Sequence, residues 1–246
     1  MRNIRITIEY DGTQYHGWQI QPNAITIQEI IEDRLKTIIQ ENVNVIASGR
    51  TDAGVHAIGQ VAHFHTSSSL DLSNIQRGLN SLLPDDIVIK EIHEAEKDFH
   101  ARYSATSKTY RYIIFNEKFP SALYRNFSWF IPFTLDISEM NKASLRLLGT
   151  HDFSSFRAAG CNSHNPVREI SHVSLKKDTK GFIIFEIEAN GFLKQMVRNI
   201  VGTLVDVGKK KIGADEFEEI FYSKDRRKAG VTAPPQGLFL VKVKYG

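Results

Sequence analysis

Cysteine is nearly absent from this chain of 246 residues, which contains only Cys161. A single cysteine excludes an intramolecular disulfide and any thiolate cluster around a metal. A lone cysteine is also more often a buried apolar residue than a nucleophile. The sequence therefore gives little support to a redox function.

Long apolar runs are absent as well. No segment approaches the roughly 18 to 20 consecutive apolar residues of a membrane-spanning helix, and residues 1–12 lack the apolar centre of a secretory signal. Hydrophobic residues still make up 41% of the sequence, which is enough for a sizeable core in one large domain or two small, closely packed ones. We expect a cytoplasmic protein with no membrane segment.

The sequence has no strong excess of one charge. Its net charge of +3 permits nucleic-acid binding without arguing for it. Basic residues gather late in the chain, at residues 209–211 and 224–228. Taken alone, each of these segments is typical of the solvated end of a helix.

Periodic patterns predict alternating strands and helices in the first half. Alternating apolar residues predict a strand at 4–10, and apolar residues at helical spacing predict a helix at 27–39. The further elements that we predict here are strands at 43–47, 61–66 and 86–94 and a helix at 72–82, which ends before Pro84.

The second half repeats these kinds of element. The patterns predict strands at 107–115, 168–177, 181–189 and 238–245, a helix at about 138–148, and a helix from Leu193 whose apolar stripe packs on a sheet. No low-complexity linker divides the chain. We therefore predict two α+β halves, residues 1–105 and 106–246, that share an interface suited to a cleft.

The segment "GRTDAG" at residues 49–54 directly follows a predicted strand. Asp52 and Gly54 fit a tight loop, since aspartate and glycine both favour turns. A turn alone does not explain Arg50, whose positive charge would hold a nearby carboxylate ionised. An ionised, oriented carboxylate is also a nucleophile suited to glycosyl transfer. Residue types alone favour the turn and leave the nucleophile open.

Two other interpretations of the first half, a zinc site and an aspartyl phosphatase, have weaker support. His63 and His65 form an H-x-H pair on one strand face, with His56 nearby, but no cysteine or well-spaced acid completes a zinc site. The segment "EYDGTQYHG" places Glu9 where an aspartyl phosphatase of the D-x-D-G-T type needs its aspartate. A glutamate is one methylene longer and would misplace the attack, so we reject this reading.

The second half offers aromatic and basic candidates. Tyr110 and Tyr112 share a strand face with Lys108, a combination that suits a stacked base beside phosphates but is more often ordinary sheet packing. Arg198 lies beside the apolar stripe of its predicted helix. It can extend to solvent or turn into the protein and pair with a carboxylate.

Together these segments resemble one family, the tRNA pseudouridine synthase A family. The matching segments follow the family's order over essentially the whole chain: "YDGTQYHGWQIQ", "ASGRTDAGVHAIGQVAHF", "LPDDI", "FHARYSATSKTYRY", "GTHDFSSF", "NGFLKQMVRNIVGTL" and "APPQGLFL". The most specific are "GRTDAGVHA" and the downstream "KTYRY".

The resemblance implies an enzyme that isomerises uridine to pseudouridine at positions 38 to 40 of the tRNA anticodon stem-loop. Asp52 would be the nucleophile, Tyr110 would stack on the uracil, Arg50 would contact RNA, and Arg198 would pair with Asp52. The expected fold is α+β, with two ferredoxin-like (RRM-like) halves sharing a continuous, mainly antiparallel sheet flanked by helices, and the active site in the cleft between them. The family forms homodimers and needs neither metal nor cofactor.

Without the resemblance, two other classes compete. One is a cofactor-free enzyme that cleaves a glycosidic bond, such as a nucleoside hydrolase. The other is a non-catalytic RNA-binding protein with two RRM-like halves, although "KTYRYIIF" lacks the glycines of the RNA-binding motif. The point of attack by Asp52 and the base that removes the C5 proton also stay open, since a phenol such as that of Tyr110 is a poor base near neutral pH.

Overall fold

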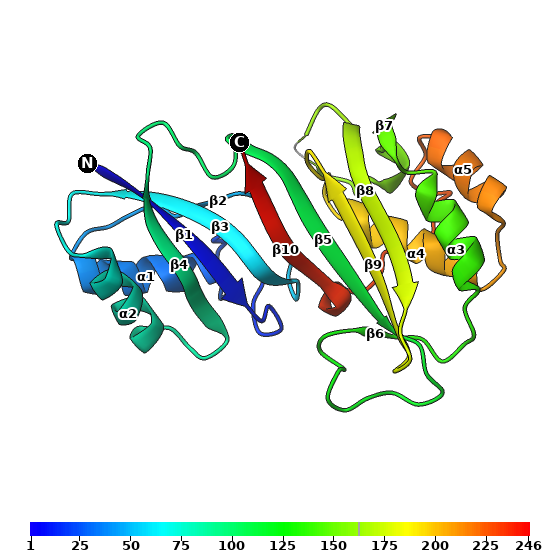
Figure 1. Cartoon of the computed structure of the whole chain (residues 1–246), viewed down its shortest axis with the longest axis horizontal. Coiled ribbons are helices and arrows are strands. Elements are labelled where there is room, and N and C mark those ends of the chain that lie inside the picture. Colours follow the sequence, from blue (N-terminus) through cyan, green and yellow to red (C-terminus); the bar gives the residue numbers. More distant parts are fainter. Residues whose placement is uncertain (162) are drawn as a thin grey trace. The chain divides into compact units, whose positions relative to one another are not determined.

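We describe the fold from a computed structural model, in which residues 1–161 and 163–246 are described. The chain forms two compact units, Met1–Thr106 with Phe239–Gly246, and Ser107–Leu238. Figure 1 shows that each unit combines strands with helices. The sequence-based boundary near residue 105 places the last strand in the second half, whereas the contacts place it in the first unit. It lies there because its Phe239 and Leu240 pair with a strand of that unit.

The first unit is built on a sheet with the strand order β4-β1-β3-β10, and β2 also pairs with β3. The pairs β1·β3 and β1·β4 are antiparallel, and β10 runs parallel to β3. Two helices pack together beside this sheet, and α2 contacts β4. The elements are β1 (Arg2–Tyr10), α1 (Ile27–Ile39), β2 (Ile46–Ala47), β3 (His56–Thr66), α2 (Leu72–Leu82), β4 (Ile87–Ala95) and β10 (Leu238–Tyr245).

The core of the first unit follows from the two periodicities. Along β1, Ile4, Ile6 and Ile8 are fully buried while the residues between them are partly exposed, as expected when alternate side chains of a strand face the core. Along α1, Ile27 and Ile31 are buried at helical spacing. Each fully buried isoleucine contributes about 1.5–3 kcal/mol by leaving water.

The second unit has a sheet with the strand order β5-β9-β8-β7, and β6 pairs with β5. The pairs β5·β9, β8·β9 and β7·β8 are antiparallel. Helix α3 contacts β8, α4 and α5. The elements are β5 (Ala105–Phe115), β6 (Trp129–Phe130), α3 (Ile137–Leu145), β7 (Gly149–Asp152), β8 (Val167–Lys177), β9 (Phe182–Ala189), α4 (Met196–Gly208), α5 (Ala214–Tyr222) and the short helices η1 (Ser154–Phe156) and η2 (Pro235–Gly237).

The α+β class with mainly antiparallel strands flanked by helices is confirmed, and several element bounds are corrected. The predicted strand at 43–47 is reduced to Ile46–Ala47, because the Val45 amide donates to Glu32 Oε1 at 2.8 Å instead of to a neighbouring strand. Helix α4 starts at Met196 and not at Leu193, since Gln195 adopts a left-handed conformation with φ of 58°. The sequence patterns missed helix α5 altogether.

Within the part of the chain that the structure describes, no helix has the length and apolar character needed to span a membrane.

Candidate active site

Asp52 lies in the loop between β2 and β3, which we call the Asp52 loop (residues 48–55). The loop contains a tight turn, because the Val55 amide donates to the Asp52 carbonyl at 3.2 Å and Gly54 adopts a φ of +73°. The Asp52 side chain is half-buried. Asp52 is therefore part of the turn and also presents a carboxylate that a ligand can reach. The two interpretations from the sequence, a turn residue and a nucleophile, do not exclude each other.

The segment that follows β1 holds the Asp52 loop in place. The hydroxyls of Tyr10 and Thr51 lie 2.8 Å apart, and the Trp18 amide donates to the Thr51 carbonyl at 3.1 Å. The Gly54 amide donates to the Tyr15 carbonyl at 3.2 Å. The side chains of Tyr10, Tyr15 and Trp18 are at most 6% exposed. The buried aromatic residues of the segment "YDGTQYHGW" thus support the loop.

Two glycines of this segment allow the close approach. A Cβ atom on Gly12 would lie 2.0 Å from the Val55 carbonyl oxygen. Gly17 has a φ of +91°, and a Cβ atom there would lie 2.6 Å from the Thr51 carbonyl oxygen. Real Cβ atoms do not approach backbone this closely, so both positions require glycine. The sequence patterns missed this supporting role of residues 10–18.

The opposite side of the Asp52 loop is held by a buried glutamine. Ser48 Oγ donates to Gln60 Oε1 at 2.8 Å, and Gln60 Nε2 donates to the Gly49 carbonyl at 2.8 Å. Gln60 is fully buried, so these bonds are shielded from water.

Arg50, in the same loop, is exposed. Among the described residues it forms no ion pair or hydrogen bond through its guanidinium. The expectation that the Arg50 charge keeps the Asp52 carboxylate ionised therefore rests on no direct ion pair of Arg50 and stays a prediction.

The histidines of β3 are structural within the first unit. His56 stacks on Phe239 with ring centroids 4.7 Å apart, and its Nδ1 accepts from the Gly12 amide at 3.0 Å. His63 Nδ1 accepts from the Ala101 amide at 3.2 Å. Burial, with smaller contributions from two nearby histidines, lowers the pKa of His63 to about 4. No group of three or more metal-binding side chains suited to an ion occurs within residues 1–161 and 163–246.

The second unit carries the other two predicted site residues. Tyr110 lies on β5 and pairs in register with Ile187 of β9. It is 8% exposed and meets the Phe192 ring edge to face, with centroids 4.9 Å apart. Phe192 lies in the turn that precedes α4. An aromatic ring fixed in this way is suited to contact a flat base.

Arg198 lies on α4 and is half-buried. Its Nε donates to the Ala233 carbonyl at 2.7 Å, and the Ala233 amide donates back to the Arg198 carbonyl at 3.1 Å. The Tyr112 hydroxyl donates to the neighbouring Pro234 carbonyl at 2.7 Å. Burial raises the pKa of Tyr112, and the nearby Arg198 charge opposes this shift. The segment "APPQG" thus orients Arg198 from outside the helix.

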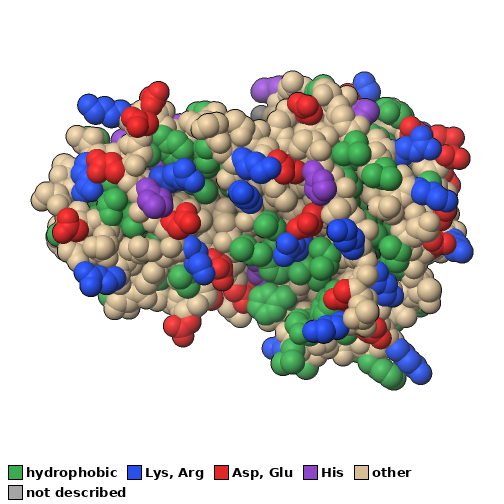
Figure 2. Space-filling view, viewed as in Figure 1, with side chains coloured by type: hydrophobic (Ala, Val, Ile, Leu, Met, Phe, Trp, Pro, Cys, Tyr) green, Lys and Arg blue, Asp and Glu red, His purple; other side chains and the backbone are tan. Residues whose placement is uncertain are grey.

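The exposed lysines of the basic segment at 209–211 pair with carboxylates. Lys210 pairs with Asp136 at 3.3 Å, and Lys211 pairs with Asp206 at 3.0 Å. Side chains of both signs are interspersed on the face shown in Figure 2. Two of the three lysines at 209–211 are therefore compensated by carboxylates.

The chain matches the model of one protein family over most of its length. The model of the family described as tRNA pseudouridine synthase matches residues 6–104 and 143–246, which include both the Asp52 loop and Arg198. The chain belongs to the tRNA pseudouridine synthase family. The resemblance noted from the sequence, and the isomerase class that it implies, are confirmed.

Individual relatives are similar to this chain over its full length. The tRNA pseudouridine synthase A of Thermoanaerobacter sp. (strain X514) is 51% identical over 245 residues, covering all of both chains. The protein of the same name from Acetivibrio thermocellus is also 51% identical over the full length of both chains. Among solved structures, a Cbf5-Nop10-Gar1 complex has a TM-score of 0.37 and 11% identity, covering 96% of this chain and 57% of that chain. This last likeness is too remote to add to the assignment.

Proposed function

We propose that this protein isomerises uridine to pseudouridine in tRNA. The observation that carries the proposal is the full-length 51% identity to proteins named tRNA pseudouridine synthase A. The supported Asp52 loop and the fixed ring of Tyr110 provide the kinds of group that the reaction needs. These are a carboxylate held in place and an aromatic surface for a base.

The reaction breaks the bond between uracil N1 and ribose C1′, turns the uracil, and forms a bond from C5 to C1′. The C5 proton is lost and N1 gains a proton, so the product is an isomer of the substrate. Asp52 is the proposed nucleophile. Its carboxylate serves in each of three routes: attack at C1′, addition to C6 of the ring, or action after elimination at the ribose. Holding the loop from both sides keeps the carboxylate oriented before the substrate arrives, which lowers the entropic cost of the reaction.

We further propose that the target lies at positions 38 to 40 of the anticodon stem-loop. A uridine within a stem must be flipped out of its stack, which costs a few kcal/mol that protein contacts must offset. Arg50 is a proposed RNA contact, because its side chain is exposed within the Asp52 loop. Tyr110 and Arg198 remain predicted site residues in the roles given above.

A homodimer in the cytoplasm is proposed with this function, on the strength of the sequence resemblance alone. Light scattering of the purified protein at micromolar concentration measures the oligomeric state directly. A mass of twice the chain is expected, and a monomer at all concentrations would contradict the homodimer.

The function is tested with tRNA transcripts that carry tritium at C5 of uridine. We expect tritium release without free uracil, and we expect release to stop when uridines 38 to 40 are replaced by cytidine. Release of free uracil would instead indicate a hydrolase that cleaves the glycosidic bond. Binding of tRNA with neither product would indicate the non-catalytic RNA-binding alternative.

A further inference from the structure

A basic pocket lies within the second unit, next to η1 and after the end of α5. Its volume is about 800 Å³. The four lysine and arginine side chains that line it are Arg157, Lys224, Arg226 and Arg227, and His164 lies among the lining residues. None of its described lining residues is a carboxylate. The pocket therefore concentrates positive charge in a protein whose net charge is only +3.

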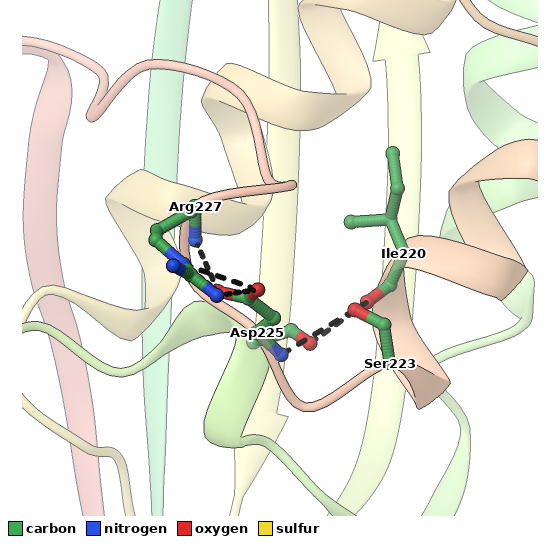
Figure 3. A network of polar contacts seen from close by, with 5 residues as sticks. Ile220, Ser223, Asp225 and Arg227 are labelled. Carbon is green, nitrogen blue, oxygen red and sulfur yellow. Dashed lines mark hydrogen bonds and ion pairs between the residues drawn. The ribbon is translucent and has the colours of Figure 1, made fainter.

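Two of the four cations are compensated by carboxylates just outside the lining. Lys224 Nζ lies 3.0 Å from Asp152 Oδ2. Arg227 makes a two-pronged contact with Asp225, shown in Figure 3, with distances of 2.9 Å from Nε to Oδ1 and 2.8 Å from Nη2 to Oδ2. These contacts lower the pKa of Asp225 to about 2. Lys224 and Arg227 therefore add little net charge.

Arg226 is different because, within residues 1–161 and 163–246, its guanidinium bonds only neutral oxygens. Nη1 donates to the carbonyls of Ala229 and Gly230 at 3.2 and 2.9 Å. Nη2 donates to Asn199 Oδ1 at 2.9 Å and to Thr232 Oγ1 at 3.0 Å. The side chain is half-buried, and this burial lowers the pKa of Arg226. A partly desolvated positive charge without a carboxylate is stabilised by an anion that enters the pocket.

Arg157 places a second such charge in the same pocket. It is half-buried, and the one hydrogen bond of its guanidinium within the described residues runs to the Ser163 carbonyl at a long 3.4 Å. Its remaining donors are therefore available to a ligand. Arginine presents its donors as a flat fork that matches two oxygens of a phosphate.

The walls of the pocket are held by the core of the second unit. Phe153, just before η1, and Phe156, its last residue, are fully buried, and the Phe153 ring packs on Phe221 of α5 with centroids 4.9 Å apart. Ser155 Oγ donates to the carbonyls of Ile220 and Phe221 at 2.7 and 3.0 Å. The backbone that carries Arg157 is thus fixed to the end of α5, which leads into the other wall. A rigid site loses little conformational entropy on binding, because the residues that line it are already ordered.

We propose that the pocket lined by Arg157 and Arg226 binds a backbone phosphate of the RNA substrate. The proposal rests on the proposed function for the identity of the RNA. The lining includes the exposed residues Gly160, Lys224 and Arg227, so a phosphate that belongs to a long chain can reach it. The volume exceeds what one phosphate group fills, which leaves room for the adjoining sugars.

The test measures the affinity of the full-length protein for a tRNA transcript as a function of salt. Each lost phosphate contact lowers the slope of log affinity against log salt by about 0.9 for duplex-like RNA and about 0.7 for single strands. We expect this reduction, and about tenfold weaker binding near physiological salt, in Arg157→Gln. Arg157→Lys keeps the charge and should recover most of the slope.

Arg77→Gln is the matched control. Arg77 lies on α2 of the first unit. Like that of Arg157, its guanidinium bonds neutral oxygens, here the Ser73 carbonyl and Asn74 Oδ1. Its removal subtracts the same formal charge and should leave the slope unchanged. Hydrogen exchange of the native protein adds a readout that needs no variant, since tRNA should protect the amides of residues 154–160 and 224–228.

The outcomes separate this proposal from the proposed function. If the protein releases tritium from labelled tRNA but Arg157→Gln binds tRNA with the native slope, the phosphate pocket is wrong and the enzyme assignment stands. An equal effect of Arg77→Gln would also overturn the pocket. If Arg157→Gln alone lowers the slope while the native protein releases no tritium, the pocket stands and the isomerase assignment fails.

Discussion

The hydroxyl of Tyr10 lies 2.8 Å from that of Thr51, the residue before the proposed nucleophile. Tyr10 ends β1 and is 3% exposed, and Thr51 is 6% exposed. Burial raises the pKa of Tyr10 to about 12, so the phenol keeps its proton well above neutral pH. The end of a core strand therefore sets the position of the Asp52 loop.

Removing this contact should slow catalysis more than it weakens tRNA binding. Tyr10→Phe and Thr51→Val each remove one hydroxyl, and each should cost about 0.5–1.5 kcal/mol of unfolding free energy. We expect kcat to fall in both variants with KM nearly unchanged, because the loop is misplaced while the RNA contacts remain. A double-mutant cycle should give a coupling of about 0.5 kcal/mol or more. If the effects of the two substitutions are strictly additive, the two hydroxyls do not interact.

Gly17→Ala should be strongly destabilising. The new Cβ would meet the Thr51 carbonyl oxygen at 2.6 Å in a residue with φ of +91°, and we expect a loss of about 2–4 kcal/mol from clash and backbone strain. Gly213→Ala is the matched control, since nothing lies within 4 Å of its Cβ position. That variant should change stability by less than about 1 kcal/mol. Chemical denaturation of both variants measures the difference, and equal stabilities would contradict the proposed packing.

Stability should fall as the pH drops from about 6.5 towards 4, because of His63. Its lowered pKa means that the unfolded chain binds a proton before the folded protein does, so protonation favours unfolding in this range. The expected loss is about 1–2 kcal/mol between about pH 7 and pH 5. Urea unfolding of the native protein and of His63→Gln, which cannot titrate, should show a shallower pH dependence in the variant. Parallel pH dependences would assign the effect to other groups.

Arg226 should stabilise the second unit much more than its neighbour Arg227. Arg226→Gln removes bonds to two carbonyls, Asn199 and Thr232, and should cost about 1–3 kcal/mol because these acceptors are partly buried. The Arg227 side chain is 90% exposed and pairs with Asp225, so Arg227→Gln should cost less than about 1 kcal/mol. Thermal unfolding of the two variants measures these losses of stability. Similar losses in both variants would contradict the predicted difference.

Much of the fold could be predicted from periodicity. The fully buried isoleucines of β1 and the helical stripe of α1 produce patterns that are visible in the sequence. Element ends were harder to predict, because they depend on distant contacts. Val45 leaves the sheet to bond Glu32 of α1, and Gln195 delays α4 by adopting a left-handed conformation. Helix α5 carries Phe217, Ile220 and Phe221 at helical spacing, a signal that was present and went unused.

The candidate site was predicted in part. The segment "GRTDAG" marked Asp52, and the aromatic spacing of β5 marked Tyr110. The support from residues 10–18 could not be read from spacing, because Tyr10 and Thr51 are far apart in the sequence and meet only through the sheet. The basic segment at 224–228 looked like a solvated helix end. Its division into a compensated Arg227 and an uncompensated Arg226 depends on the fold of the loop that follows α5.

The most direct test of the account is single-turnover tritium release from C5-labelled tRNA by the native protein and by Asp52→Asn, at enzyme concentrations that saturate the tRNA. Asparagine has nearly the same shape as aspartate, so tRNA affinity and thermal stability should stay close to the native values. The account predicts that the rate falls by at least about 10³-fold, as expected when a nucleophile is removed. Release by Asp52→Asn within about tenfold of the native rate would show that this carboxylate is a turn residue and not the nucleophile.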